Sequence, residues 1–288
     1  MTVVFSVIFP NNLTYFPSFL KSLEKQTNQN FKLILINDGV IDLDKYLQKL
    51  PFECETHFVK NLTPFEIRIY GLKQVLKLNP DFIIFADTDD LFSKNRVEVL
   101  LNKLEVYPFV CNDIDLMDDK NFIITNSYWK YRFKEDFVFD INFFKNKNII
   151  GLGNAGMQVW PLKQMLKKLD QISSGNDWLF FSSAENNLKG LFVSTCSTHY
   201  RQHENNLIGK KKLDEEGLIK IIKVKIEHYK FLLKIGFNAF NVEKELNYNE
   251  KIENWLLNNK KEAANQLSII NNLNYNFVWW EEPNFLKI

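Results

Sequence analysis

The feature that most constrains the fold is an alternation, repeated through the first half of the chain, between short apolar runs and longer amphipathic stretches. The runs Thr2–Phe9, Lys32–Ile36 and Asp81–Ala86 are rich in Ile, Val, Leu and Phe. Such continuous runs are typical of strands that are buried on both faces. Between them, apolar residues recur at helical spacing over Tyr15–Lys25 and Pro64–Leu78. The alternation predicts an α/β fold with a mostly parallel central sheet flanked by helices.

Further elements are expected along the chain, with less regular spacing. The other predicted strands are Glu55–Val59, Phe109–Asp113, Met157–Trp160 and Leu191–Thr195, and the other predicted helices are Asp42–Leu50, Asn95–Glu105 and Asn176–Asn187. Residues 210–270 are rich in Lys and Glu, have Leu and Ile at helical spacing and contain no proline. We therefore expect one domain over residues 1–210 and a helical C-terminal extension of two or three helices over residues 211–288.

Composition argues against several classes of protein. Lys and Arg number 36 and Asp and Glu number 35, so the net charge of +1 gives no overall attraction to nucleic acid. The three widely spaced cysteines, Cys54, Cys111 and Cys196, argue against a disulfide framework or a zinc ribbon and favour a reducing cytoplasm. No apolar run reaches the ~20 residues that a membrane-spanning helix needs. The N-terminus lacks a basic segment and is expected to form a strand rather than a signal peptide.

Three acidic turns follow apolar strands, at Asp38, at Asp87–Asp90 and at Asp113. Ligands of open parallel sheets bind at the carboxyl ends of the strands, so these turns are candidates for a site. For Asp38 or Asp113 alone, the preference of Asp for turns is a sufficient explanation. The three carboxylates of Asp87–Asp90 repel one another unless a cation or hydrogen-bond donors neutralise them. That segment predicts binding of a divalent ion together with a phosphate, with a capped turn as the alternative.

Two later polar segments are candidates for the same chemistry. His199 and His203 flank Arg201, where an imidazole would reach a metal ion and a guanidinium would bind a phosphate. Histidines without such a role are the alternative. Asp177 precedes an apolar helical run, so it is either a general base or a helix cap. Residues 151–156, GLGNAG, have the G-x-G-x-x-G spacing, but they lack a strand-to-helix context and a following Lys-Ser/Thr, so they are a weak candidate for a phosphate loop. The chain has no Walker A, H-E-x-x-H, G-x-S-x-G or C-x-x-C motif, which argues against the classes of site that those motifs mark.

Five separated segments, in this order, resemble the family 2 glycosyltransferases, which have the A-type nucleotide-sugar-binding fold. FSVIFPNN is similar to the family's first strand, and LKSLEKQTNQNFKLILINDG is similar to its first helix, second strand and acidic turn. Arg68 lies where the family has an arginine, and Asp87-Thr88-Asp89-Asp90 matches its Asp-x-Asp signature. GNDWLFFSSA followed by GLFVSTCSTHYRQHENNLIG resembles the tail of rhamnosyltransferase-like members. The resemblance covers residues 1–210 and implies that they form a nucleotide-sugar-binding catalytic domain.

The resemblance also implies how the donor is bound. The implied nucleotide-sugar-binding residues are Pro10, Asp38, Arg68, Asp87, Thr88 and Arg201. Asp38 would contact the nucleotide base, and Arg68 would lie beside the base or the phosphate. Asp87 would face the ribose and the water shell of the metal ion. Arg201, with Asn206, would order the loop over the diphosphate.

The remaining implied roles concern the metal ion and the proton. Asp89 and His203 would hold Mn²⁺ or Mg²⁺ against the diphosphate, and Asp177 would deprotonate the acceptor hydroxyl. The ion would stabilise the leaving diphosphate, and a single in-line displacement would invert the anomeric centre. The acidic turn departs from the family pattern, since Asn37 and Val40 replace an Asp and a Ser.

The expected function is therefore an inverting, metal-dependent transfer of a sugar from a UDP- or dTDP-sugar to a hydroxyl of a growing bacterial surface glycan, such as a capsule or a lipopolysaccharide. The alternatives are a catalytically degenerate sugar-nucleotide-binding subunit and a nucleotidyltransferase, which normally has a Gly-rich basic loop where this chain has PNNLTYF. The expected partners are the donor and a glycan or lipid-linked acceptor, in the cytoplasm or at the inner face of the plasma membrane. Val278–Trp280 and Phe285–Leu286 form an aromatic patch that either packs on the main domain or contacts lipid.

Overall fold

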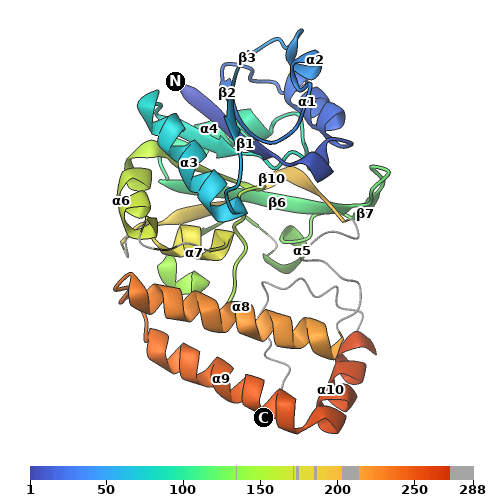
Figure 1. Ribbon diagram of the computed structural model, residues 1–288, viewed down its shortest axis with the longest axis vertical. Coiled ribbons are helices and arrows are strands. Elements are labelled where there is room, and N and C mark those ends of the chain that lie inside the picture. Colours follow the sequence, from blue (N-terminus) through green and yellow to red (C-terminus); the bar gives the residue numbers. More distant parts are fainter. Residues whose placement is uncertain (134, 171, 173–174, 185–186, 203–213, 273–288) are drawn as a thin grey trace.

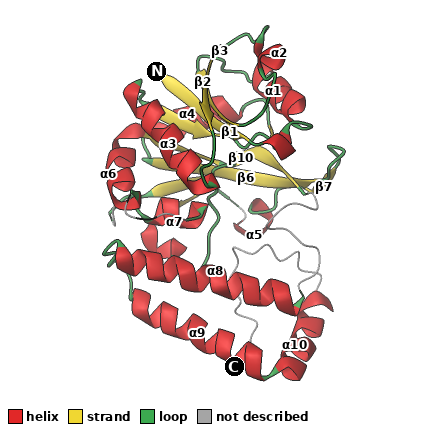
Figure 2. Ribbon diagram, viewed as in Figure 1, coloured by secondary structure: helices red, strands yellow, loops and turns green. Residues whose placement is uncertain are grey.

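The computed structural model of the chain describes all residues except 134, 171, 173–174, 185–186, 203–213 and 273–288. One sheet with helices on its two sides forms the upper part of the molecule in Figure 1, and a layer of long C-terminal helices lies below it. Figure 2 shows the same division, with the strands gathered in the upper part and only helices in the lower layer. The expected α/β fold class is confirmed.

The N-terminal strands form a parallel block. In spatial order they are β3 (Glu53–Val59), β2 (Lys32–Asp38), β1 (Thr2–Ile8) and β4 (Phe82–Phe85). Alternate residues of β1 face opposite sides of the sheet, so that Val4 packs with helix α1 (Phe16–Glu24) and Phe5 packs with helix α3 (Pro64–Lys77). Both faces are covered, which explains why these strands are continuous apolar runs.

The rest of the sheet mixes strand directions. It continues from β4 through β9 (Ala155–Gln158), β6 (Phe109–Met117), β10 (Gly190–Arg201) and β5 (Leu91–Phe92), while β7 (Ile123–Thr125) pairs with β6 and β8 (Phe137–Phe139) pairs with β10. Strand β9 is antiparallel to both β4 and β6, whereas β6 and β10 are parallel to each other. A single antiparallel strand therefore joins the N-terminal block to the second parallel pair.

Three of the predicted strands in this region were wrong in their bounds. Strands β6 and β10 continue past Asp113 and Thr195, the residues where we expected them to end. Val159 and Trp160, which we expected in a strand, begin helix α6 (Val159–Leu169). Pro161 stands in the first turn of that helix, where its missing N–H breaks no helical hydrogen bond. The remaining short elements are η1 (Pro10–Asn12), α2 (Asp44–Leu47), α4 (Arg96–Leu104), α5 (Lys130–Phe133), η2 (Ile141–Phe144) and α7 (Asp177–Ser182).

Within the described residues the C-terminal layer contains three helices, where the sequence predicted two or three. They are α8 (Glu215–Lys234), α9 (Val242–Asn258) and α10 (Lys260–Asn272). They share an apolar core that includes Ile222, Ile252 and Leu256, and α8 contacts α7 of the α/β part. Within the described residues no helix is long and apolar enough to cross a bilayer. The aromatic patch at 278–286 lies outside the described residues, and the domain boundary at residue 210 stays a prediction.

Candidate active site

The acidic turn Asp87–Asp90 follows β4, beside the C-terminal end of the parallel strand β1. Two side-chain hydroxyls fix it there. Ser6 Oγ donates to the Ala86 carbonyl at 2.7 Å, and Thr88 Oγ1 donates to the Val7 carbonyl at 2.9 Å. Thr88 is fully buried. Its observed contact is with the backbone of β1, so Thr88 shapes the turn.

The carboxylates of Asp87 and Asp90 converge on one glycine. The Oδ2 atoms of both lie 2.9 Å from the point where a Cβ on Gly153 would stand. Asp90 Oδ1 accepts the backbone N–H of Arg201 at 2.9 Å, whereas its Oδ2 is buried without a partner among the described residues. Burial and the neighbouring acids raise the pKa of Asp90 well above its usual value. Burial also raises the pKa of Asp87 to about 7, although Arg68, 3.9 Å away, opposes that shift.

A buried cation beneath the turn was missed by the sequence analysis. Arg96 donates from Nη2 to the carbonyls of Phe85 at 2.8 Å and Gly153 at 3.1 Å, and from Nε to Asn112 Oδ1 at 2.8 Å. Its side chain is almost fully buried, and that burial lowers its pKa to about 10. A signal for this role was present, because Arg96 is four residues before Leu100 and therefore shares the buried face of α4. Arg96 ties the end of β4 to the loop that carries Gly153.

That loop, residues 151–154, lies between the acidic turn and Asp177. Leu152 donates its backbone N–H to Asp177 Oδ2 at 3.0 Å, and a Cβ on Gly151 would stand 3.4 Å from the same oxygen. The N-cap of α7 is Asn176, whose Oδ1 accepts the N–H of residue 179 at 2.9 Å. Asn176, and not Asp177, therefore caps α7. The Asp177 carboxylate faces the loop 151–154 instead.

Asp177 and Arg68 also line a common cleft between α3 and α7. Its lining residues are Phe65, Arg68, Ile69, Leu152, Gly175, Asn176, Asp177 and Phe180. The wall is mainly apolar and aromatic, with one cation and one carboxylate, which is a composition suited to a sugar ring that offers both an apolar face and hydroxyls.

Arg201 contacts the acidic turn through its backbone and its side chain. Nε donates to the Asp89 carbonyl at 2.6 Å, Nη1 to the Asp118 carbonyl at 3.1 Å, and Nη2 to Asn121 Oδ1 at 2.7 Å. The guanidinium therefore joins the acidic turn to the β6–β7 connection. Asn206, which the resemblance paired with Arg201, lies outside the described residues.

The nucleotide-base candidates lie at the same edge of the sheet, at the ends of β1 and β2. Asp38 is the last residue of β2 and is partly exposed, and Pro10 begins η1 just after β1. Asn37, which stands where the family has an acid, is buried and closes the turn itself: its Oδ1 accepts the Val40 N–H at 2.7 Å and its Nδ2 donates to the Val40 carbonyl at 2.9 Å. Gly39 takes the positive φ of +81° that this turn needs. The departure at residue 37 therefore leaves the turn intact.

The third acidic candidate, Asp113, lies inside β6 rather than in a turn. Its Oδ1 accepts the N–H groups of Ile114 at 2.9 Å and Trp129 at 2.7 Å, and its Oδ2 accepts the N–H of Lys130 at 3.1 Å. Both oxygens are thus engaged by the backbone, and Asp113 anchors the start of α5 to the sheet.

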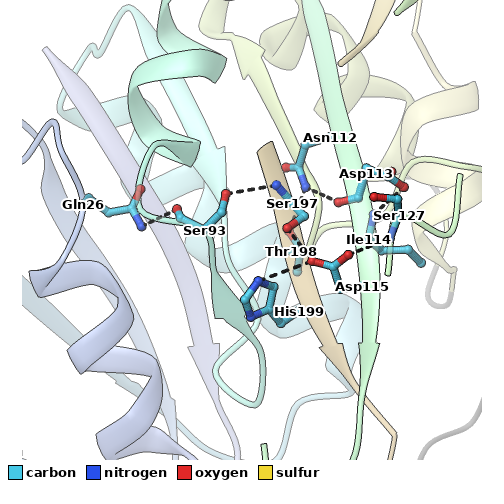
Figure 3. Close-up of polar contacts among 10 residues, drawn as sticks. All are labelled: Gln26, Ser93, Asn112, Asp113, Ile114, Asp115, Ser127, Ser197, Thr198 and His199. Atoms are coloured by element: carbon cyan, nitrogen blue, oxygen red, sulfur yellow. Dashed lines mark hydrogen bonds and ion pairs between the residues drawn. The ribbon is translucent and has the colours of Figure 1, made fainter. Parts of the chain in front are cut away.

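Asp115, two residues along β6, has a similar role. Figure 3 shows its carboxylate between Ser127 and Ser197, with Oδ1 accepting the Ser127 N–H at 2.7 Å and Oδ2 accepting the Ser197 hydroxyl at 2.6 Å. His199 Nε2 is 3.4 Å from the same Oδ2 (Figure 3). Burial lowers the pKa of His199, while Asp115 opposes that shift. His199, in β10, therefore lies beside the structural carboxylate of Asp115 in β6.

The residues near the acidic turn suit a hard divalent cation. Asp90 Oδ2 is a buried oxygen without a partner among the described residues, and the pKa values of Asp87 and Asp90 are both raised, as expected where a cation would compensate clustered carboxylates. Mg²⁺ typically takes one or two carboxylates and completes its shell with phosphate oxygens and water. Within the described part of the chain, no group of three His, Cys, Asp or Glu side chains surrounds a common point. His203, the expected partner of Asp89, lies outside the described residues.

Comparison with known sequences points to one family. Residues 6–170 match the profile of the family described as glycosyl transferase family 2. An uncharacterised glycosyltransferase of Rickettsia bellii is 33% identical over 111 residues, which is 36% of this chain and 16% of that protein. The uncharacterised glycosyltransferase YwdF of Bacillus subtilis is 24% identical over 126 residues, which is 42% of this chain and 46% of that protein. The chain therefore spans less than half of the length of these relatives.

Comparison with solved structures agrees on the fold. Staphylococcus aureus TarS in complex with UDP-GlcNAc has a TM-score of 0.57 at 17% identity, over 85% of this chain and 70% of that chain. GalNAc-T7 with UDP, GalNAc and Mn²⁺ has a TM-score of 0.54 at 12% identity, over 90% of this chain and 56% of that chain. At these identities the likeness concerns the fold alone.

Proposed function

The chain belongs to glycosyl transferase family 2, and from that premise we propose that it is an inverting, metal-dependent transferase. It moves a sugar from a UDP- or dTDP-sugar to a hydroxyl of a growing bacterial surface glycan. The observation that carries the proposal is the loop 151–154. This loop contacts the Asp177 carboxylate through Leu152 and the Asp87 and Asp90 carboxylates through Gly153. The proposed base and a cluster of acids suited to a cation therefore lie against the same short loop.

The donor is held at the edge of the sheet where β1, β2 and β4 end. Asp38 binds the nucleotide base, Pro10 contacts the nucleotide-sugar, and Arg68 lies beside the base or the phosphate. Asp87 faces the ribose and the water shell of the ion. Thr88 and Arg201 act by shaping the acidic turn, which follows from their hydrogen bonds to Val7 and to Asp89. The other four proposed donor-binding residues contact the donor directly; they are Pro10, Asp38, Arg68 and Asp87.

Asp89 and His203 are the proposed ligands of Mn²⁺ or Mg²⁺. When bound, the ion neutralises charge that develops on the leaving diphosphate. Arg201 supports Asp89 by donating to its backbone carbonyl at 2.6 Å, so the turn is pre-organised before any ligand arrives. The high pKa values of Asp87 and Asp90 mean that these carboxyls hold protons in the free protein at lower pH. A cation held beside them would favour their ionised form.

Asp177 is the proposed general base. Its carboxylate accepts the proton of the acceptor hydroxyl as the acceptor oxygen bonds to the anomeric carbon, and the bond from that carbon to the diphosphate oxygen breaks with its electron pair leaving on the diphosphate. Attack from the opposite face inverts the anomeric centre. The cleft between α3 and α7 brings the acceptor to Asp177, and its aromatic wall at Phe65 and Phe180 packs against the sugar ring.

A donor screen followed by turnover assays tests this function. UDP- and dTDP-sugars are screened for binding by thermal shift, and the best donor is then assayed for transfer or hydrolysis with Mn²⁺ and with EDTA. The variant Asp177→Asn should reduce turnover about 10²- to 10⁴-fold while donor binding is kept. The matched control is Asp170→Asn, which removes an exposed acid that pairs with Lys73 on the surface at 2.8 Å.

The outcomes separate the proposed enzyme from its alternative. Full turnover in EDTA would show that the reaction needs no metal ion. Full turnover of Asp177→Asn would show that Asp177 is not the base. Tight donor binding without turnover on any acceptor would instead identify a sugar-nucleotide-binding subunit that has lost catalysis.

A further inference from the structure

Asp177 and Trp178 are consecutive residues of α7 that are held by different parts of the structure. Asp177 Oδ2 accepts the N–H of Leu152 at 3.0 Å. The Trp178 indole is fully buried and donates from Nε1 to the carbonyl of Phe144 at 2.8 Å. Helix α7 has only six residues, which is too short for a helix that is stable alone. Its orientation, and with it the position of the Asp177 carboxylate, therefore depends on these tertiary contacts.

One face of α8 covers the Trp178 indole. The His228 ring stacks on it with the ring centroids 3.7 Å apart and the ring planes 11° apart. Tyr229 meets it edge-on at 5.9 Å and 74°, and Lys225 Nζ lies 5.3 Å from the ring centroid. These three residues are spaced i, i+3 and i+4, so they lie on the same side of α8. Figure 1 shows α7 directly above α8, at the boundary between the α/β part and the helical layer.

The same face of α8 also fixes the segment that follows η2. Lys225 Nζ donates to the carbonyl of Asn146 at 2.5 Å, and the Tyr229 hydroxyl donates to the carbonyl of Lys145 at 2.7 Å. Lys145 Nζ in turn lies 3.0 Å from Glu245 Oε1 on α9. Because Trp178 donates to the last residue of η2, the helix α7, this segment and α8 form one closed set of contacts.

The aromatic ring of His228, and not its nitrogens, makes the contact with α7. Both ring nitrogens are buried without a hydrogen-bond partner among the described residues. Burial, and after it the charge of Lys225, lowers the pKa of His228 well below its usual value, so the ring is neutral at physiological pH. Leaving a buried polar group without a partner costs about 1–3 kcal/mol. A phenylalanine ring would avoid that cost and keep the stack.

We infer that Trp178 and His228 are positioning residues for the transfer reaction: through their stack, α8 holds α7 in the orientation that presents the Asp177 carboxylate to the cleft. The inference rests on the proposed role of Asp177 as the base. Helices α7 and α8 both lie outside residues 6–170, the part that matches the family profile. The face of α8 that carries Lys225, His228 and Tyr229 thus contributes to catalysis by holding α7.

Three variants of the full chain test the inference. His228→Ala removes the stacked ring, and His228→Phe restores a flat ring without nitrogens. Leu256→Ala is the matched control, because Leu256 is fully buried in the core shared by α8, α9 and α10 and is not part of the Trp178 contacts. For each variant we would measure the melting temperature, the donor KM, and kcat at a temperature well below melting.

We expect the His228 and Leu256 variants to lower the melting temperature alike, but only the loss of the His228 ring to lower kcat. His228→Ala lowers kcat about 10- to 100-fold with the donor KM within about twofold of the wild type, because a displaced base slows the chemical step without touching the donor site. His228→Phe recovers kcat to within about twofold. Leu256→Ala lowers the melting temperature by as much as His228→Ala while kcat is unchanged. If His228→Ala does not fold, His228→Leu replaces it, since leucine has similar volume but no flat ring.

Other outcomes overturn the inference. A wild-type kcat in His228→Ala, or an equal loss of kcat in Leu256→Ala, would show that the stack is merely structural. Asp177→Asn, measured beside these variants, separates this failure from a failure of the proposed function. If Asp177→Asn abolishes turnover while His228→Ala does not lower kcat, only the positioning role is rejected. If Asp177→Asn retains full turnover, the base itself is rejected.

Discussion

Two pairs of acids, Asp87 with Asp90 after β4 in the N-terminal block of the sheet and Asp113 with Asp115 in β6 of the second part, differ in what their carboxylates contact. Every carboxylate oxygen of Asp113 and Asp115 accepts at least one hydrogen bond from the protein, mainly from backbone N–H groups of residues 127–130. Asp87 and Asp90 instead converge on the bare backbone of a glycine, and Asp90 Oδ2 has no partner within the described residues.

The difference shows how an acid with a structural role can be distinguished from an acid that is available to bind a ligand. Protein donors that already fill both oxygens leave no room for a cation, and their loss weakens the fold. Acids without such donors are stable in a buried position only when a proton or a cation compensates them. In sequence the two pairs look alike, since each follows or ends an apolar strand. The predictions below use that contrast.

The largest effect is expected from replacing Asp89, which stands between the first pair in the acidic turn, and comparing it with a replacement of Asp115 in β6. Asp89→Ala, in the acidic turn, should lower turnover about 10²- to 10⁴-fold with little change in the free energy of unfolding. Asp115→Ala should do the opposite, lowering the free energy of unfolding by about 1–3 kcal/mol because Ser127 and Ser197 lose their acceptor, with turnover unchanged below melting. Turnover assays and urea unfolding of both variants check this. A large loss of turnover in Asp115→Ala would break the contrast.

A second effect concerns the glycine on which the acids converge. In Gly153→Ala the added Cβ would stand 2.9 Å from the Oδ2 atoms of Asp87 and Asp90, closer than ordinary contact, so the carboxylates must move apart. We expect turnover to fall about 10²-fold. Gly151→Ala is the matched control in the same loop, because its Cβ would lie 3.4 Å from Asp177 Oδ2, which is an ordinary contact. Equal turnover of the two variants would contradict the proposed geometry.

The sequence predicted the parts of the site whose signals are local. Strands β1, β2 and β4 are continuous apolar runs because both their faces are covered, and their ends place Asp38 and Asp87 at one edge of the sheet. The helical layer follows from the periodicity of residues 210–270. These elements could be predicted from the spacing of their own residues alone.

The parts that sequence reasoning missed depend on partners far along the chain. Arg96 is buried because its acceptors are the carbonyls of Phe85 and Gly153 and the side chain of Asn112, which only the sheet brings together. Asp113 looked like a turn residue because its donors lie 16 and 17 residues further on. The spacing within α4 indicates that Arg96 is buried, but neither spacing nor composition identifies the distant partners of Arg96 and Asp113.

A third, smaller effect concerns Asp113, whose replacement should change the free energy of unfolding but not turnover. Asp113→Ala leaves the buried N–H groups of Ile114 and Trp129 without their acceptor, which should lower the free energy of unfolding by about 2 kcal/mol. Turnover below the melting temperature should stay within about twofold of the wild type. Denaturant unfolding and an initial-rate assay check the two halves of this prediction. An unchanged unfolding curve would show that the start of α5 is held by other contacts.

The smallest effect is a pH dependence of metal binding that belongs to the acidic turn only. Because burial raises the pKa of Asp87 to about 7, this carboxyl carries a proton below pH 7 and must release it when a cation binds beside it. The affinity for Mn²⁺ should therefore fall as the pH is lowered, by at most about tenfold per pH unit below 7, and level off above it. Isothermal titration with Mn²⁺ between pH 5.5 and about 8.5 measures this.

Two variants sharpen that measurement. Asp87→Asn removes the titrating carboxyl, so its Mn²⁺ affinity should be lower than that of the wild type at pH 8 and should change little as the pH falls to about 6. Asp115→Asn, in the pair that already has its donors, should keep the wild-type pH dependence, because the oxygens of Asp115 already accept hydrogen bonds from Ser127 and Ser197 and are not expected to bind the ion. A wild-type slope in Asp87→Asn would mean that another group releases the proton, and Asp90, whose pKa is also raised, is the next to replace.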